Sequence, residues 1–181
     1  MDFLEFKPIA RYSRPIVITE KIDGMNCQIA ISPDGELKAG VRTQWIDKDT
    51  DHDGLGMGFW QWTQDNKEEL VATLGKGRHY GEWYGYNLSH GYGLSERRFA
   101  LFNTKRWTET TKPKCCGVVP ILYAGDFTTG IVEQTLDELI VSGSKMVEGW
   151  MRPEGIIIYH IAADVFFKKT VFRDEGKKAR N

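Results

Sequence analysis

A small set of charged residues falls within or beside apolar segments, and these residues are the first candidates for chemistry. They are Lys21 after PIVITE, Glu82 in GEWYG, Glu154 before GIIIYH and Lys168 in DVFFKK. Burying a charge is unfavourable unless it is paired or bound to an ion. The lysines and glutamates meet this requirement either as structural salt bridges or as the charged groups of a reactive groove, and both interpretations are open at this point.

A lysine amine acts as a nucleophile only after it has lost its proton. Its reference pKa is ~10.4, and desolvation or a second cation nearby lowers it. Lys168 or a bound metal ion could supply that second charge near Lys21. The carboxylates could hold a metal ion or the hydroxyls of a ribose, and the ring of Phe102 offers a flat face for a base. These residue types suit a nucleotide groove in which Lys21 is the nucleophile.

The residue pattern predicts the elements that must position these side chains. Strands are expected at residues 14–20, 25–31, 37–42, 78–85, 97–103, 117–125, 154–160 and 164–172. The Asp23-Gly24 step predicts that the first and second strands pair as a hairpin. Helices are expected at residues 59–75 and 131–143, each ended by a glycine, and loops at 43–58 and 87–96. Because the strands arrive mostly as hairpins, the predicted fold class is α+β with antiparallel sheets.

The bulk composition is that of a soluble globular domain. The 181 residues are 41% apolar and 27% charged. No run approaches the ~20 apolar residues of a membrane span, and the N-terminus does not resemble a signal peptide, so a cytoplasmic protein is expected. The net charge of −1 excludes a strongly basic field over the whole protein, so any nucleic acid must be bound by local patches. The three cysteines are expected to be reduced, and the four histidines lack zinc-ligand spacing.

Short motifs occur in the order found in the covalent nucleotidyltransferases. EKIDG at residues 20–24 matches the KxDG motif around the nucleophilic lysine of that superfamily, and AGVRT supplies Arg42 at a ligase-like spacing. GEWYG, FALFN, EGIIIYH and VFFKKT resemble the later motifs. The chain therefore resembles the ATP-dependent RNA and DNA ligases and the mRNA capping enzymes. The start EKIDGMN and the short layout are most similar to the RNA ligase branch, in particular to small ligase-like proteins of phages and bacteria.

The resemblance implies a ligase-type nucleotidyltransferase (adenylation) domain, whose antiparallel sheets form an ATP groove flanked by helices. Lys21 would attack the α-phosphate of ATP, releasing pyrophosphate and leaving a covalent lysyl-AMP. The AMP would pass to the 5′-phosphate of an RNA or DNA strand, and a 3′-hydroxyl would then displace it and seal the strand. Mg²⁺ or Mn²⁺ would neutralise charge on the α-phosphate, and Lys168 would contact the same phosphate.

The resemblance also implies a role for individual residues. Glu82 would take the ribose hydroxyls, and Phe102 would stack on the adenine. Asp23 and Glu154 would stand near the metal ion, through water. The other expected ATP contacts are Glu20 at the adenine edge, Ile22 and Asn26 around the KxDG turn, Arg42 at phosphate or ribose, and Lys168 or Lys169 in the last motif.

The match departs from the family pattern in the last motif and in length. That motif usually has two lysines separated by one residue, whereas Lys168 and Lys169 are adjacent. Neighbours on a strand point to opposite faces, so only one of them can face the groove, and Lys168 is expected to do so. Residues 1–172 are expected to form the nucleotidyltransferase domain and residues 173–181 a polar tail, with no C-terminal OB-fold. A separate chain is then a candidate source of a second domain, and Arg11 and Arg14 are candidate pyrophosphate contacts.

Several alternatives remain open. Within the same chemistry the chain could be a minimal DNA ligase or a GTP-dependent capping-type guanylyltransferase. A non-catalytic nucleotide- or nucleic-acid-binding module is a different class, and the presence of Lys21 and Glu154 argues against it. DTDHDG at residues 49–54 matches the first half of a calcium-binding loop, but Trp60 stands where that loop needs a glutamate. The loop at 87–96 is either a flexible connection or a lid in which Tyr92 and Arg97 meet nucleic acid.

Overall fold

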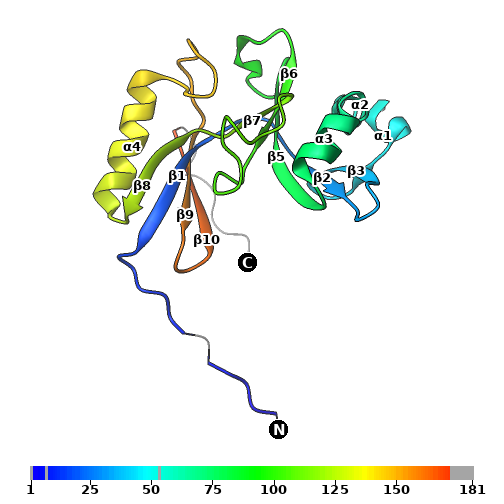
Figure 1. Cartoon of the computed structure of the whole chain (residues 1–181). Coiled ribbons are helices and arrows are strands. Elements are labelled where there is room, and N and C mark those ends of the chain that lie inside the picture. The colour runs from blue at the N-terminus through cyan, green and yellow to red at the C-terminus, as the bar shows by residue number, and fades with distance from the viewer. Residues whose placement is uncertain (1, 7, 53, 172–181) are drawn as a thin grey trace. The chain divides into compact units, whose positions relative to one another are not determined.

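The structure is a computed structural model and describes residues 2–6, 8–52 and 54–171. The expected polar tail at 173–181 lies outside the described residues. The chain divides into two compact units, Met1–Lys21 with Pro120–Asn181 and Ile22–Val119. It therefore passes from the first unit to the second immediately after Lys21. Figure 1 labels the helices and strands of both units.

The first unit is a four-stranded antiparallel sheet with one helix packed on it. Its strand order is β10-β9-β1-β8, with bounds Val165–Thr170, Gly155–His160, Pro15–Lys21 and Ile121–Asp126. Helix α4, Thr129–Ser142, runs beside β8 and β1 (Figure 1). One face of the sheet packs on α4, and the core between them comprises Ile16, Ile18, Leu136, Leu139, Ile156 and Ile158.

Helix α4 has clear sequence signals at both ends. The hydroxyl of Thr128 accepts a hydrogen bond from the backbone N–H of Ile131, which caps the first turn. Gly143 ends the helix at φ 76°, and its N–H donates to the carbonyl of Leu139. The predicted stop at Gly143 is confirmed, and the helix begins two residues earlier than the apolar stripe suggested.

The second unit is a six-stranded sheet in the order β4-β3-β2-β5-β6-β7. The strand bounds are Trp45–Ile46, Leu37–Val41, Met25–Ile31, Gly77–Gly85, Arg97–Leu101 and Cys116–Val118. All neighbouring pairs are antiparallel except β6 with β7, which is parallel. The short helices of this unit are α1 (Lys48–His52), α2 (Phe59–Asp65), α3 (Lys67–Leu74) and the 3₁₀ turn η1 (Gly91–Gly93). The predicted α+β class with mainly antiparallel sheets is confirmed.

The two faces of this sheet have different environments. Phe59, Leu70 and Leu74 of α2 and α3 pack on one face in a core that includes Ile29 and Phe99. Along β2, buried and partly exposed residues alternate, as the period of two in a strand requires. The residues between the buried ones, which are Asn26, Gln28 and Ala30 on β2, therefore lie on the face away from the helices.

The expected hairpin between the first two strands is wrong. β1 pairs with β8 and β9, whereas β2 pairs with β3 and β5. The Asp23-Gly24 step instead carries the chain between the two units. A side chain at Gly24 would place its Cβ 2.3 Å from the carbonyl oxygen of Trp83 on β5, so this glycine permits a close backbone contact rather than a two-residue hairpin turn.

Other boundaries also differ from the predictions. The expected helix at 59–75 is divided into α2 and α3 at Asn66, although its stop at Gly75 is confirmed. The expected strand at 117–125 is divided around Pro120 into β7 and β8, which belong to different sheets. The expected loop at 43–58 contains β4 and α1. Within the described ranges, the structure has no helix with the length and apolar character needed to cross a bilayer.

Candidate active site

Lys21 ends β1 and forms an ion pair with Glu154. The Lys21 Nζ atom donates to Glu154 Oε2 at 2.6 Å, and the two side chains are 20% and 22% exposed. Glu154 is 133 residues away along the chain, and the next residue, Gly155, lies directly opposite Lys21 in the β1–β9 pair. The sheet register therefore brings the carboxylate to the amine, and both groups remain accessible to a ligand.

The backbone around Glu154 is fixed by close strand packing. Gly155 has φ 153°, and a Cβ atom there would lie 2.2 Å from the carbonyl oxygen of Lys169. The N–H of Val171 donates to the carbonyl of Glu154 at 2.9 Å. A glycine is therefore required directly after Glu154, and this contact with the neighbouring strand helps to hold the carboxylate beside Lys21.

Lys168 lies on the same face of the first sheet as Lys21. Thr19 pairs with Ile157, and Ile157 pairs with Lys168. Directly opposite residues on neighbouring strands point to one face, and Lys21 is two residues beyond Thr19 on the same strand. This is the face away from α4, so the exposed Lys168 amine shares an open sheet face with the Lys21–Glu154 pair.

Lys169 lies on the opposite face, towards α4. It pairs with Ile156, which pairs with Glu20 and belongs to the core under the helix. The Lys169 Nζ atom is 2.5 Å from Glu133 Oε1 on α4. The two adjacent lysines are thus separated by the strand alternation, and Lys169 ties the edge strand β10 to the helix.

Glu20 is buried immediately before Lys21, with 1% of its surface exposed. Its carboxylate accepts hydrogen bonds from the Ser144 hydroxyl at 2.6 Å and from the backbone N–H groups of Lys145 at 2.7 Å and Met146 at 3.0 Å. Burial raises the pKa of Glu20, and these hydrogen bonds oppose that change. The side chain therefore anchors the segment after α4, and its expected contact with the adenine edge stays a prediction.

In the second unit, Asn26 and Glu82 form a side-chain pair on the sheet face away from the helices. They lie directly opposite each other on β2 and β5, and Asn26 Nδ2 donates to Glu82 Oε2 at 2.7 Å. Glu82 is only 4% exposed. Phe102 follows β6 with 38% of its surface exposed, and Arg42 follows β3 and is exposed.

The turn after Lys21 is bound by the loop at residues 87–96. The Asp23 carboxylate lies 2.5 Å from His90 Nδ1, and the Asp23 backbone N–H donates to the Tyr92 hydroxyl at 2.7 Å. Tyr92 is 3% exposed and packs edge-on against Tyr84. Ile22 at the start of the turn is also buried. This loop is therefore an ordered support for the turn rather than only a flexible connection.

The carboxylates suit a metal ion that is held jointly with a ligand. In the parts of the chain that the structure describes, no group of three or more His, Cys, Asp and Glu side chains is arranged to hold a metal ion. Magnesium typically takes one or two protein carboxylates and completes its shell with phosphates and water. Glu154 in the first unit and Asp23 in the second are each a carboxylate of the type that such a shell uses, and their place at a metal ion stays a prediction.

The described part of the acidic segment, residues 49–52, lies in a helix rather than in an open loop. Residues Lys48–His52 form α1, and Asp51 is 8% exposed, with its Oδ2 accepting from the backbone N–H of Gln61 at 3.1 Å. The carboxylate of Asp51 thus turns inward against α2.

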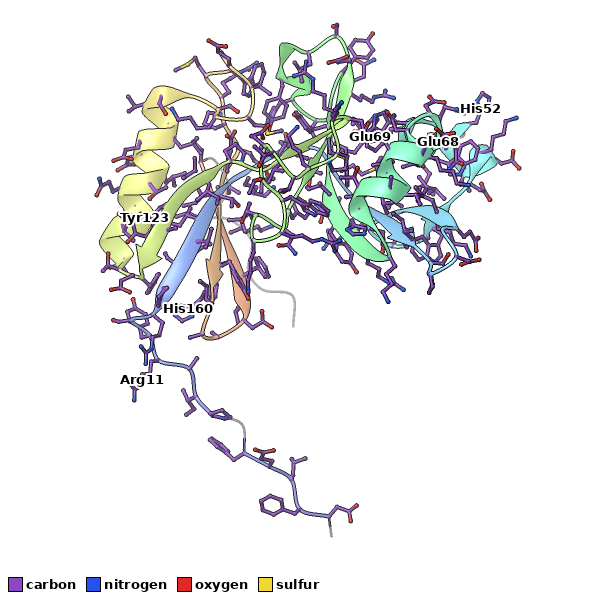
Figure 2. All side chains as sticks on the ribbon, in the orientation of Figure 1. Arg11, His52, Glu68, Glu69, Tyr123 and His160 are labelled. Carbon is purple, nitrogen blue, oxygen red and sulfur yellow. The ribbon has the colours of Figure 1, made fainter. Side chains whose placement is uncertain are left out.

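The expected site residues are divided between the two units. The first unit holds Lys21, Glu154 and Lys168 on one sheet face and Glu20 and Lys169 on the other. The second unit holds Ile22, Asp23, Asn26, Arg42, Glu82 and Phe102. Arg11 and Arg14 are exposed on the segment before β1, where Figure 2 shows Arg11, and their pyrophosphate role stays a prediction. That segment is attached at its end, because His160 Nε2 lies 2.9 Å from the Tyr12 carbonyl oxygen.

The sequence did not predict three contacts of these residues. They are the contacts of Asp23 with His90, of Glu20 with Ser144 and of Lys169 with Glu133. Ser144 and Glu133 are 124 and 36 residues from their partners, and no local pattern links them. For His90 alone the sequence gave an indication, because the Gly-rich GYGL stretch beside it suggested that the loop at residues 87–96 could be a lid.

Comparison with known families decides the assignment. The family model described as RNA ligase matches residues 14–171. The chain belongs to the RNA ligase family. Compared with curated protein sequences, it shows no significant match.

Solved RNA ligases have the same fold. A mutant Naegleria gruberi RNA ligase with AMP and Mn matches with a TM-score of 0.64 and 16% identity, over 88% of this chain and 50% of that one. A second mutant of that protein with AMP and Mn matches with a TM-score of 0.63 and 16% identity, over 88% and 50%. A third, with ATP and Mn, matches with a TM-score of 0.61 and 15% identity, over 86% and 48%. This RNA ligase family member thus spans about half the length of the structures it matches.

Proposed function

We propose that this RNA ligase family member is an ATP-dependent RNA ligase that works through a covalent lysyl-AMP on Lys21. Residues 1–172 act as its adenylation domain. The observation that carries the proposal is the pair of Lys21 and Glu154 at 2.6 Å, at the end of β1 and within the EKIDG motif. The family match over residues 14–171 supports the same reaction class.

The first step forms one bond and breaks another at the α-phosphorus of ATP. The Lys21 amine gives up a proton and bonds to phosphorus, and the bond to the pyrophosphate oxygen breaks. Glu154 is positioned to receive that proton or share it with water, because its carboxylate already accepts a hydrogen bond from the amine. Lys168, on the same sheet face, stabilises the negative charge that develops on the phosphate oxygens.

Residues of the second unit bind the rest of the nucleotide. The Glu82 carboxylate, oriented by Asn26, accepts hydrogen bonds from the ribose hydroxyls, and the Phe102 ring stacks on the adenine. Arg42 contributes its planar guanidinium to phosphate or ribose oxygens. A divalent ion, Mg²⁺ or Mn²⁺, would be held by Glu154 and Asp23 through water and would neutralise charge on the α-phosphate.

The next steps transfer AMP and seal the strand. A 5′-phosphate oxygen of RNA attacks the same phosphorus, so the P–N bond breaks and the Lys21 amine is regenerated. A 3′-hydroxyl then attacks the 5′-phosphate and AMP leaves, which makes the new phosphodiester. The Mn with ATP or AMP in the matched N. gruberi RNA ligase structures supports this choice of cofactors.

The decisive experiment is label transfer without nucleic acid. The protein is incubated with Mg²⁺ and α-labelled ATP or GTP and run on a denaturing gel. We expect label from ATP on the wild type and none on Lys21→Ala. Lys76→Ala, a change of the same type at an exposed lysine after α3, is the matched control and should keep the label.

The outcomes separate the alternatives. Label from GTP alone would assign the chain to capping-type guanylyltransferases, and label that survives in Lys21→Ala would overturn the nucleophile. Bound nucleotide without label would indicate a binding module. A second assay with 5′-phosphorylated RNA or DNA, as a nicked duplex or a single strand, then decides whether the product is that of an RNA or a DNA ligase.

A further inference from the structure

Three partly exposed aromatic side chains lie in one row across the second sheet. Gly40 pairs with Trp45, Gln28 pairs with Gly40, and Gln28 pairs with Tyr80. The N–H of Phe102 donates to the Tyr80 carbonyl at 3.0 Å, which continues the row beyond β6. Directly opposite residues share a face, so the row lies on the face away from the helices, beside Asn26 and Glu82.

The row is open to solvent. Trp45, Tyr80 and Phe102 are 43%, 51% and 38% exposed. Small or flexible residues separate them, because Gly40 and Gln28 occupy the positions between Trp45 and Tyr80. A Cβ atom at Gly40 would lie 2.9 Å from the Trp45 ring, so the glycine allows that ring to lie flat over β3.

The strands set the backbone positions of the three aromatic residues. Neighbouring strands are about 4.8 Å apart, so the Tyr80 backbone is about 5 Å from that of Phe102 and about 14 Å from that of Trp45. The proposed function uses Phe102 for the adenine of ATP. Tyr80 and Trp45 are then aromatic surfaces that the nucleotide does not occupy.

The next row on the same face is basic. Ala30 pairs with Lys38 on one side and with Arg78 on the other. The Arg78 guanidinium lies 5.4 Å from the centre of the Trp45 ring, and Lys38 is well exposed. Cations beside exposed rings are the combination that binds the phosphates and bases of an unpaired strand.

Two acidic groups of this region have partners within the protein. Glu82 is buried and accepts a hydrogen bond from Asn26. Glu36 forms a salt bridge with Lys38 at 3.5 Å, and because the two side chains are 59% and 60% exposed, Lys38 can exchange this partner for a phosphate. A basic and aromatic face therefore exists on a protein whose total charge is −1, as local binding of nucleic acid requires.

We propose that this face, the aromatic row, is a platform for the single-stranded part of the RNA substrate. Bases stack on Tyr80 and Trp45, and Arg78 and Lys38 contact the phosphates. Any base can stack on these rings, because every base has a π face. The platform therefore binds RNA with little sequence preference. The inference deepens the proposed function and rests on it for the choice of RNA and for the use of Phe102.

The test measures RNA affinity separately from label transfer. Binding of a fluorescent, 5′-phosphorylated single-stranded RNA is followed by anisotropy without nucleotide, for wild type, Trp45→Ala, Tyr80→Ala and Tyr80→Phe. Loss of one stacked base weakens binding by about 5- to 150-fold, which corresponds to ~1–3 kcal/mol. We expect that loss in both alanine variants and near-wild-type affinity in Tyr80→Phe, which keeps the ring.

Two controls make the result specific. Tyr86→Ala removes a ring that is 50% exposed in the same unit but lies outside the row, and it should bind RNA as the wild type does. Lys38→Ala should lower the slope of log affinity against log salt by about 0.7, as loss of one phosphate contact on a single strand predicts.

The outcomes distinguish this inference from the proposed function. Wild type that takes label from ATP but binds RNA equally well in all variants overturns the platform, as does an equal loss in Tyr86→Ala. Wild type that binds RNA through Tyr80 and Trp45 but takes no label refutes the ligase reaction and supports the platform. If the alanine variants change self-association in sizing experiments and not RNA affinity, the row is a protein interface and the inference is wrong.

Discussion

The adjacent lysines of β10 lead to a sharp prediction, because the sheet register places them on opposite faces of the sheet. Lys168 shares the open face with Lys21, and Lys169 pairs with Glu133 on the helix side. Lys168→Ala should therefore impair formation of the lysyl-AMP. Lys169→Ala should leave that reaction intact and affect only the attachment of β10 to α4.

The expected magnitudes differ in kind as well as in size. Removing a donor aimed at charge that develops in a transition state lowers the rate by about 10²- to 10³-fold, or ~2.7–4 kcal/mol. The Lys169–Glu133 pair has side chains that are 30% and 59% exposed, so solvent screens it. Its loss should lower the free energy of unfolding by only ~0.2–1 kcal/mol.

Single-turnover labelling with α-labelled ATP and denaturant unfolding, run on both variants, measure the two quantities. Lys168→Ala should fail in the first assay and unfold nearly as the wild type does, because its side chain is exposed. If Lys169→Ala blocks labelling while Lys168→Ala does not, the inference from strand alternation is refuted. Equal losses in both variants would also refute it.

Three further predictions concern the support of the site. Ser144→Ala should lower the free energy of unfolding by ~1.5–3 kcal/mol in chemical denaturation, because it removes a hydrogen bond to the buried Glu20 carboxylate; an unchanged midpoint would contradict this. Burial lowers the pKa of His79, so the unfolded chain binds a proton more readily and stability should fall as pH drops below the ordinary histidine range; His79→Gln should lose that slope. Phe102→Ala should weaken ATP binding by ~1–3 kcal/mol in calorimetry while tryptophan fluorescence reports an intact fold.

Local sequence was sufficient for most elements and insufficient for their partners. The apolar alternation of β2 and the glycine after α4 act through neighbouring residues, so their positions were predictable. The Asp23-Gly24 step has the chemistry of a hairpin turn, but the strands on each side bury their apolar faces in different cores. The partners of β1 begin at Ile121 and Gly155, far along the chain from Lys21, so no local pattern reveals them.

The candidate site shows the same limit. The motif residues were identifiable because their spacing resembles a family pattern, yet the sequence could not show that Glu20 turns inward to Ser144. The sequence favoured Lys168 over Lys169, but only the register of β9 against β10 places Lys168 on the face of Lys21. Side-chain direction depends on strand pairing, and strand pairing depends on the whole chain.

The position of β1 in its sheet has a consequence during synthesis. Both of its neighbours, β8 and β9, come from residues after Pro120, whereas the second unit is one continuous segment that is complete at Val119. A growing chain can fold the continuous segment first. Ile16 and Ile18 become buried only after the strands and the helix that cover them have been synthesised. Lys21 is synthesised 133 residues before Glu154, so their ion pair can form only after the continuous segment Ile22–Val119 has been made.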